Sequence, residues 1–270
     1  DVWLCSGQSN MQWALRLTDR FTTDGPASAD DGLRLFSVER RVAAKPAERL
    51  LEGEWAAASP ETTADFSAVA YYFGRELRRE LGIPIGLIHS SWGGTRAEAW
   101  TPIDDIAAGP PMVSKLMDHW RGRLPADTGE VTVQQPGALY NAMIHPLRDR
   151  PIAGVIWYQG EANAARAEQY RELMPLLIES WRGVFGRDDL PFGMVQLASF
   201  KARVETPTET PWAELRDAQL HTARTLPDVG LACAIDIGEA NDIHPRNKHD
   251  VGVQIGRAHR LNSSHQPVSR

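Results

Sequence analysis

The stretch WLCSGQSNMQW, residues 3–13, joins a short apolar run to a helix-like pattern through a small polar turn. Continuous apolar runs are typical of parallel strands buried on both faces. Ser9, where the helix-like pattern begins, is either a helix cap or a nucleophile beside free backbone N–H groups. Gly7 allows a sharp turn before it, and Ser6 belongs to the strand end. Met11 takes the place of the last glycine of G-x-S-x-G, so the stretch is not that nucleophile elbow.

The same alternation of strand and helix continues along the chain. Apolar runs predict strands over Val2–Ser6, Leu33–Val38, Ile85–His89, Gly154–Tyr158, Phe192–Leu197 and Gly230–Ile235. Helical periods predict helices over 66–81, 164–185 and 212–225, with a kink or restart at Pro175. This order predicts an α/β fold of three αβα layers around a mainly parallel sheet. In such folds, functional residues gather at the carboxyl ends of the strands.

The composition is that of an ordinary globular protein. The chain has 270 residues, 42% hydrophobic, and a formal net charge of −6, which predicts neither a nucleic-acid nor a membrane partner. No apolar stretch reaches the ~20 residues that a membrane span needs. Cys5 and Cys233 lie in apolar runs and are expected to be free thiols in the core. The polar segments 19–32 and 124–137 are expected to be surface loops.

The two ends of the sequence look unusual. The chain opens directly in a predicted strand without an initiator Met, so we expect residues to be missing before it. At the other end, RLNSSHQPVSR (260–270) has no apolar period and is similar to a translated cloning or adapter scar. We therefore expect one domain over 1–256 and an unstructured tail over 257–270, with a natural disordered tail as the alternative.

Three further predicted strands are followed by residues that could carry chemistry. Gly93 and Gly94 form a doublet after the third strand, where a backbone N–H can approach a ligand closely, although an ordinary tight turn explains them too. The fourth strand leads into Gln159, Glu161 and Asn163, for which helix capping is the alternative interpretation.

The last predicted strand is followed by NDIHP. There, Asp242 and His244 point to the same side of an extended segment, which suits a carboxylate that orients an imidazole. His89 and His145 are competing bases. A zinc site is not expected, because His244 and His249 are badly spaced for one helix face and no cysteine accompanies them. Together with Ser9, these segments supply a nucleophile, oxyanion donors, a base and an acid, which is the inventory for acyl transfer.

Six motifs, in this order along the chain, carry a resemblance to a known family. They are DVWLCSGQSNMQW, SSWGGTRAEAW, LYNAMIHPL, GVIWYQGEANA, WAELRDAQ and DIHPRNK. Over residues 2 to 256 the chain resembles the sialate O-acetylesterase family of SGNH-type hydrolases and is similar to the acetylxylan esterases of carbohydrate esterase family six. The resemblance implies a flavodoxin-like αβα fold and hydrolysis of acetyl esters on sugars, without a metal or cofactor.

The resemblance also implies a role for individual residues. Ser9 matches the nucleophile of the family and His244 the base. Gly94 falls at the glycine of the second motif, and Gln159 stands where the wider superfamily has an Asn that completes the oxyanion hole, a departure that the sugar-esterase branch shares. With the backbone N–H of Ser9, these two are the expected oxyanion donors. The acid is open between the carboxylate of Asp242, that of Glu161 and a backbone carbonyl at 242, because the superfamily places an Asp three residues before the His and this chain has Asn241 there.

The substrate is expected to be an acetylated sugar, first of all an O-acetylated sialic acid. Arg96 is a candidate partner for a sialic-acid carboxylate, with a surface arginine as the alternative, and Asn163 is a second candidate contact. A sugar platform of Trp92, Trp100 and Trp157 competes with core packing of the same rings. The alternative functions are an acetylxylan or general carbohydrate acetylesterase and a non-catalytic glycan-binding domain. The substrate class suggests a periplasmic or secreted protein, and the oligomeric state stays open.

Overall fold

A seven-stranded sheet forms the centre of the computed structural model, which describes residues 1–50, 52–202, 204–206 and 208–263. The strands are β1 (Val2–Gly7), β2 (Asp30–Ser37), β3 (Ala56–Ala58), β4 (Ile85–Ser91), β5 (Gly154–Tyr158), β6 (Phe192–Gln196) and β7 (Val229–Cys233). Their order in the sheet is β3-β2-β4-β1-β5-β6-β7, and every pairing is parallel except that of β2 with β3.

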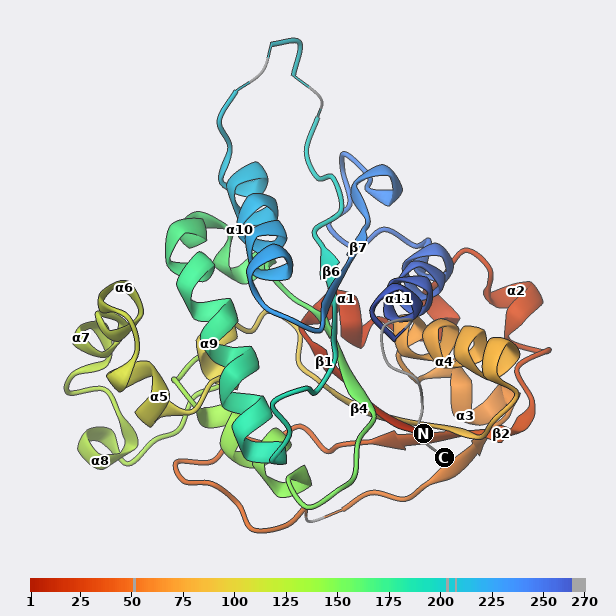
Figure 1. Cartoon of the computed structure of the whole chain (residues 1–270), viewed down its shortest axis with the longest axis horizontal. Coiled ribbons are helices and arrows are strands. Elements are labelled where there is room, and N and C mark those ends of the chain that lie inside the picture. The colour runs from red at the N-terminus through yellow and green to blue at the C-terminus, as the bar shows by residue number, and fades with distance from the viewer. Residues whose placement is uncertain (51, 203, 207, 264–270) are drawn as a thin grey trace.

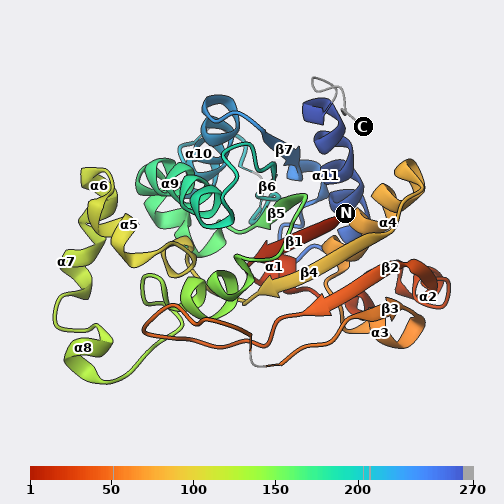
Figure 2. The same ribbon diagram turned by 60° about the horizontal axis from the view of Figure 1, so that its bottom comes forward.

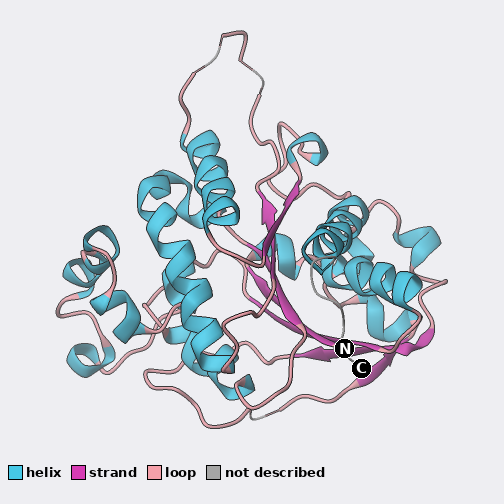
Figure 3. Ribbon diagram, in the orientation of Figure 1, coloured by secondary structure: helices cyan, strands magenta, loops and turns pink. Residues whose placement is uncertain are grey.

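Helices cover both faces of the sheet (Figure 1, Figure 3). The long helices α4 (Ala68–Leu81) and α11 (Lys248–Ser263) pack together on one face. On the other face, α9 (Ala167–Phe185) packs against α10 (Pro211–Thr225). The predicted three-layer αβα architecture is confirmed. Within it, β4 lies between β2 and β1, whereas the second strand pairs directly with the first in the flavodoxin order.

Shorter helices complete the layers. They are α1 (Ser9–Gln12), α2 (Phe21–Asp24), α3 (Pro60–Ala64), α5 (Ile103–Ala108), α6 (Pro111–Ser114), α7 (Leu116–Trp120) and α8 (Pro125–Thr128). Figure 2 shows α5 to α8 grouped beyond α9, on the side away from β2 and α4. Short segments of 3-10 or π helix lie at Leu15–Leu17, Ala97–Trp100, Tyr140–Ile144, His145–Leu147, Glu161–Arg166 and Ile235–Ile237. No helix in the described part of the chain is long and apolar enough to cross a bilayer.

Local sequence signals explain the bounds of α4. Ser67 caps its start by accepting from the Ala70 N–H, and Gly82 ends it with φ +68°. The expected apolar stripe is buried at Val69, Phe73 and Leu77, whereas Leu81 in the last turn is exposed. The stripe packs on the sheet, so burial of these side chains drives the docking of the helix.

Several expectations about local structure are wrong. The helix does not restart at Pro175: α9 runs through it unbroken, because its buried face holds the turns on either side together despite the missing backbone bond. Segment 19–32 contains α2 and the first residues of β2, and segment 124–137 contains α8. The sequence analysis did not predict β3, which pairs antiparallel with β2, because its three residues are too few to form a recognisable apolar run.

The two cysteines differ in burial. Cys5 is buried as expected, but Cys233 is exposed because it closes β7 at the surface. Both are free thiols.

The carboxyl end of the chain differs from the expectation of an unstructured tail after residue 256. Helix α11 continues to Ser263, so the first seven residues of that expected tail are helical. The remaining tail residues, 264–270, lie outside the described residues.

Candidate active site

Ser9 opens α1 at the carboxyl end of β1, the central strand of the parallel sheet. The turn before it depends on Gly7, whose φ is +138°. A Cβ at Gly7 would lie 2.1 Å from the main-chain oxygen of Tyr158, so no other residue fits this position. The next residue, Gln8, donates its N–H to the same oxygen at 3.0 Å. The expected role of Gly7 in a sharp turn is thus met, and β5 fixes where Ser9 emerges.

His244 lies beside Ser9, although 235 residues separate them. The distance between Ser9 Oγ and His244 Nε2 is 2.8 Å. Trp13 stacks on the imidazole, with ring centroids 5.0 Å apart and an angle of 18° between the planes. Burial, aided by the positive charge of Lys248, lowers the pKa of His244, and the carboxylate of Asp242 acts in the opposite direction. At neutral pH the imidazole is therefore uncharged and able to accept a proton.

The two candidate acids occupy different places. Asp242 Oδ1 accepts the backbone N–H of His244 at 2.8 Å, in an Asx turn, and lies 4.0 Å from His244 Nδ1. Glu161 is half-buried, and its Oε1 accepts from Asn10 Nδ2 at 2.5 Å. Asp242 is thus the carboxylate next to the imidazole, whereas Glu161 reaches the histidine loop only through Asn10.

A buried polar cluster behind the pair escaped the sequence analysis. Lys248, at the start of α11, is fully buried, and its Nζ donates to Asn10 Oδ1 at 2.5 Å. Asn10 Nδ2 donates to Glu161 Oε1 and, at 3.0 Å, to the carbonyl of Ile243. Burial lowers the pKa of Lys248 to about 7 and raises the pKa of Glu161. The signal was present in the sequence, since Asn10 follows Ser9 and Lys248 lies four residues after His244.

The glycine doublet after β4 lies against the nucleophile. The Gly93 N–H donates to Gln12 Oε1 at 2.7 Å, and a Cβ on Gly93 would lie 3.2 Å from the Cβ of Ser9. The N–H groups of Ser9 and Gly94 have no acceptor in the described part of the chain. Gly94 has φ +75° with open space where a Cβ would be. The doublet therefore brings backbone to the nucleophile, and Gly93 makes the close approach.

Gln159 and Asn163 are held inside the molecule. Gln159 Nε2 donates to the carbonyl of Thr95 at 3.2 Å and to Asn163 Oδ1 at 2.7 Å, which engages both of its amide hydrogens. Asn163 Oδ1 also accepts the Ala97 N–H, and its Nδ2 donates to Glu98. Asn163 is buried with all these bonds internal, so it supports the loop and does not face the cleft.

The remaining residues expected to bind substrate are not among the described residues that line the Ser9 cleft. Trp100 and Trp157 are fully buried and meet edge to face, with centroids 6.2 Å apart, so core packing explains both. Trp92 is half-buried. The side chain of Arg96 is not among the described residues that line the cleft. Trp13, two residues beyond Met11 in the first motif, instead lines the cleft and stacks on His244.

Ser9 and His244 line a cleft of about 630 Å³. Its wall includes His89, which meets the hydroxyl of Ser91 at 2.5 Å, so this competing base is engaged elsewhere. The other competitor, His145, contacts the carbonyl of Ala47 at 3.0 Å through Nδ1. The described residues contain no group of three or more His, Cys, Asp or Glu side chains suited to hold a metal ion.

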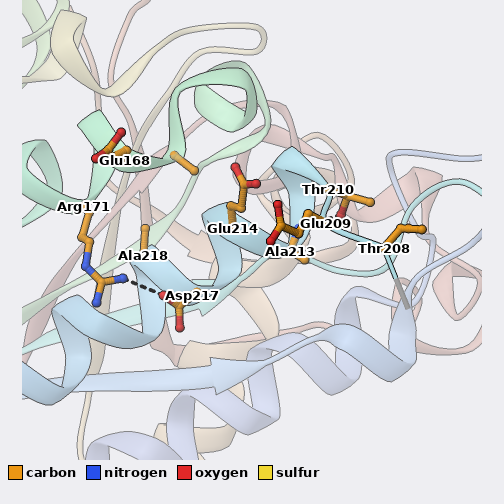
Figure 4. A pocket seen from close by; sticks show the side chains of 10 residues that line it. Glu168, Arg171, Thr208, Glu209, Thr210, Ala213, Glu214, Asp217 and Ala218 are labelled. Atoms are coloured by element: carbon orange, nitrogen blue, oxygen red, sulfur yellow. Dashed lines mark hydrogen bonds and ion pairs between the residues drawn. The ribbon is translucent and has the colours of Figure 1, made fainter. Parts of the chain in front are cut away.

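A second cavity, of about 770 Å³, lies between α9 and α10 (Figure 4). It is lined by four carboxylates and one arginine, and Arg171 pairs with Asp217 at 2.6 Å. Neither Ser9 nor His244 borders it. The cavity thus has acidic walls and lacks a nucleophile and base, which leaves the Ser9 cleft as the candidate active site.

Comparisons with known proteins agree with this geometry. Residues 1–259 match the family model described as carbohydrate esterase, sialic acid-specific acetylesterase. Sialate O-acetylesterase of Homo sapiens is 34% identical over 281 residues, which cover 94% of this chain and 52% of that protein. The Mus musculus protein of the same name is 31% identical over 296 residues, which cover 94% of this chain and 55% of that protein. The chain thus spans about half the length of these relatives.

Solved structures are similar to this chain over nearly its whole length. A carbohydrate acetylesterase from Xanthomonas citri superposes with a TM-score of 0.86 at 42% identity, over 98% of this chain and 57% of that one. A protein from Arabidopsis thaliana superposes with a TM-score of 0.57 at 19% identity, over 98% of both chains, and is similar in fold alone.

Proposed function

Because the chain belongs to the carbohydrate esterase family of sialic acid-specific acetylesterases, we propose that it removes O-acetyl groups from acetylated sugars through an acetyl-serine intermediate. The observation that carries the proposal is the 2.8 Å contact between Ser9 Oγ and His244 Nε2 in an open cleft. A serine hydroxyl is a weak nucleophile alone, and a neutral imidazole within hydrogen-bond reach activates it.

In the first step, Ser9 Oγ attacks the carbonyl carbon of the acetyl ester while His244 Nε2 takes the hydroxyl proton. Asp242 stabilises the imidazolium that forms, because its carboxylate lies 4.0 Å from Nδ1. The tetrahedral intermediate then collapses, the bond to the sugar oxygen breaks, and His244 returns the proton to that oxygen. The sugar leaves with a free hydroxyl, and the acetyl group stays on Ser9.

The negatively charged oxygen of the tetrahedral intermediate must be stabilised by hydrogen-bond donors. The N–H groups of Ser9 and Gly94 are free to serve, and each such donor is worth about 3 kcal/mol. Gln159 joins them only if it exchanges one of its present acceptors, Thr95 or Asn163. In the second step, His244 deprotonates a water that attacks the acetyl-serine, and acetate leaves as Ser9 recovers its proton.

The substrate class within this reaction follows the relatives. We place O-acetylated sialic acids first, since the family model and the mammalian relatives are named for them. A general carbohydrate acetylesterase is the alternative, in keeping with the name of the Xanthomonas citri structure. The intact serine and histidine pair argues against a glycan-binding domain without catalysis. A periplasmic or secreted location would bring the enzyme to such glycans.

Replacement of the nucleophile tests the proposal. Ser9→Ala should lower kcat/KM for an aryl acetate about a thousandfold or more, with the circular dichroism spectrum unchanged. Ser6→Ala is the matched control, because Ser6 is buried in β1 and its Oγ has no partner in the described residues. Activity of the control should stay within about threefold of the parent. Retained activity in Ser9→Ala would remove the basis of the proposed mechanism.

A further inference from the structure

The cleft beside Ser9 has an unbalanced positive charge. Among the described residues that line it, the permanently charged side chains are Arg16, Arg40 and Asp65. Arg16 and Asp65 pair with each other at 2.5 Å and cancel. Arg40 has no carboxylate partner anywhere in the described part of the chain. Since the whole chain carries a formal net charge of −6, this unpaired cation is a local feature of the cleft.

Arg40 is an exposed residue in the wall of the cleft that contains Ser9, and its neighbours place it there. Just before it, the Val38 N–H donates to the carbonyl of His89 at 2.9 Å, which extends the pairing of β2 with β4. The guanidinium carbon of Arg40 lies 5.7 Å from the ring centroid of Trp92, within cation–π range. Trp92 in turn donates its N–H to the carbonyl of Gly7 at 3.1 Å. The guanidinium thus contacts a residue, Trp92, that is bonded to the turn before Ser9.

Apart from the paired Arg16 and Asp65, the other polar side chains that line the cleft with Arg40 are uncharged. Burial, with the charge of Arg40 as a second cause, lowers the pKa of His89 to about 4, so its imidazole is neutral at pH 7. The hydroxyls of Ser37 and Ser91 also line the cleft. One guanidinium among neutral donors and acceptors is complementary to one carboxylate that is surrounded by hydroxyls.

We propose that Arg40 binds the carboxylate of an acidic acetylated sugar while the acetyl ester lies at Ser9, so that the cleft selects sugar acids over neutral sugars. The inference rests on the proposed esterase function and adds to it the residue that binds the negative charge of the substrate. Arg40 takes the part that the sequence suggested for Arg96, whose side chain lies outside the cleft lining. It is a binding residue and takes no part in the proton transfers.

The test compares two substrates that differ only in charge. They are an O-acetylated N-acetylneuraminic acid and the same sugar with its carboxylate replaced by a carboxamide, with acetate release as the readout. Arg40→Gln should lower kcat/KM for the acid about tenfold to a hundredfold, mainly through KM, and leave the carboxamide and an aryl acetate within about twofold. Arg41→Gln is the matched control, because Arg41 is adjacent, pairs with Glu39 at 3.8 Å and does not line the cleft.

Salt provides a second readout, since raised ionic strength should weaken the preference of the parent for the acid and leave the Arg40→Gln enzyme unaffected. Equal losses on acid and carboxamide, or a parent without preference for the acid, would overturn the inference. If the parent cleaves the aryl acetate but Arg40→Gln keeps the preference, the esterase function stands and the assignment of Arg40 is wrong. A parent that cleaves none of the three esters overturns both.

Discussion

The side-chain amide of Asn10 donates to the main-chain carbonyl of Ile243 at 3.0 Å. The residue that follows Ser9 therefore holds the residue that precedes His244. The same amide group bridges the buried Lys248 and the half-buried Glu161, two ionisable side chains that would be costly to enclose without partners. This cluster joins the first turn of the chain to its last loop, which the strand pairings alone do not connect.

Loss of the Asn10 side chain should misalign the pair. Asn10→Ala leaves the Ile243 carbonyl, Lys248 and Glu161 without their shared partner, so we expect unfolding to become easier by about 1–3 kcal/mol. We also expect kcat to fall with little change in KM, because Asn10 does not line the cleft. Urea unfolding and steady-state kinetics measure the two effects. The control is Asn241→Ala, at an exposed position on the His244 loop. A change in KM alone for Asn10→Ala would contradict the positioning role of Asn10.

Separate charge removal at the two carboxylates should identify the acid. Asp242→Asn keeps an oxygen to accept the His244 N–H and loses only the charge, so kcat should fall about tenfold to a thousandfold. Glu161→Gln should lower kcat by less than about tenfold, since Glu161 Oε1 accepts a hydrogen bond from Asn10 and makes none to His244. Steady-state turnover of an aryl acetate at saturating concentration decides between them. The reverse order of losses would make Glu161 the acid.

The pH profile should report the charge of Lys248. Activity requires neutral His244, so kcat/KM rises with pH through its pKa, which burial and Lys248 keep below the usual value. Around the imidazole, Asp242 is the opposing charge, and the other contacts, Ser9 and Trp13, are neutral. Lys248→Met removes one cause of the lowered pKa, so the acid limb should move to higher pH, by less than about one unit.

The sign of this shift has a further consequence. Because the pKa of Lys248 is about 7, the parent carries that charge mainly below pH 7, and the rates of parent and variant should converge at higher pH. The limb is measured as kcat/KM against pH with an aryl acetate. A limb that stays in place, or moves to lower pH, would show that Lys248 does not act on His244.

Gly7 should tolerate no side chain. Gly7→Ala places a Cβ against the Tyr158 carbonyl in a backbone conformation that L-residues rarely adopt, so we expect a loss of about 3 kcal/mol or more in the free energy of unfolding. The control is Gly82→Ala, at the end of α4, where φ is +68° and a Cβ meets open space. There the loss should be about 1–2 kcal/mol. Equal losses in urea unfolding would contradict the clash.

The sheet could be predicted because apolar runs and helical periods are local properties of the chain. β1, β4 and β5 were expected within two residues of their observed ends. The antiparallel β3 was missed because its three residues are paired by β2 and have no signal of their own. The exposure of Cys233 likewise depends on which elements cover the end of β7, and an apolar run does not encode that.

For the site, the amino-acid sequence by itself determined the nucleophile turn and the histidine loop. Gly7, Ser9 and His244 occupy positions at strand ends that follow from the order of strands and turns. Only the tertiary structure decided the partners: Asp242 beside the imidazole, Asn10 and Lys248 behind it, Arg40 in the cleft, and Gln159 and Asn163 turned inward. The physical reason is that hydrogen bonds and charge pairs form between residues distant in the chain, so their geometry exists only after the layers have packed.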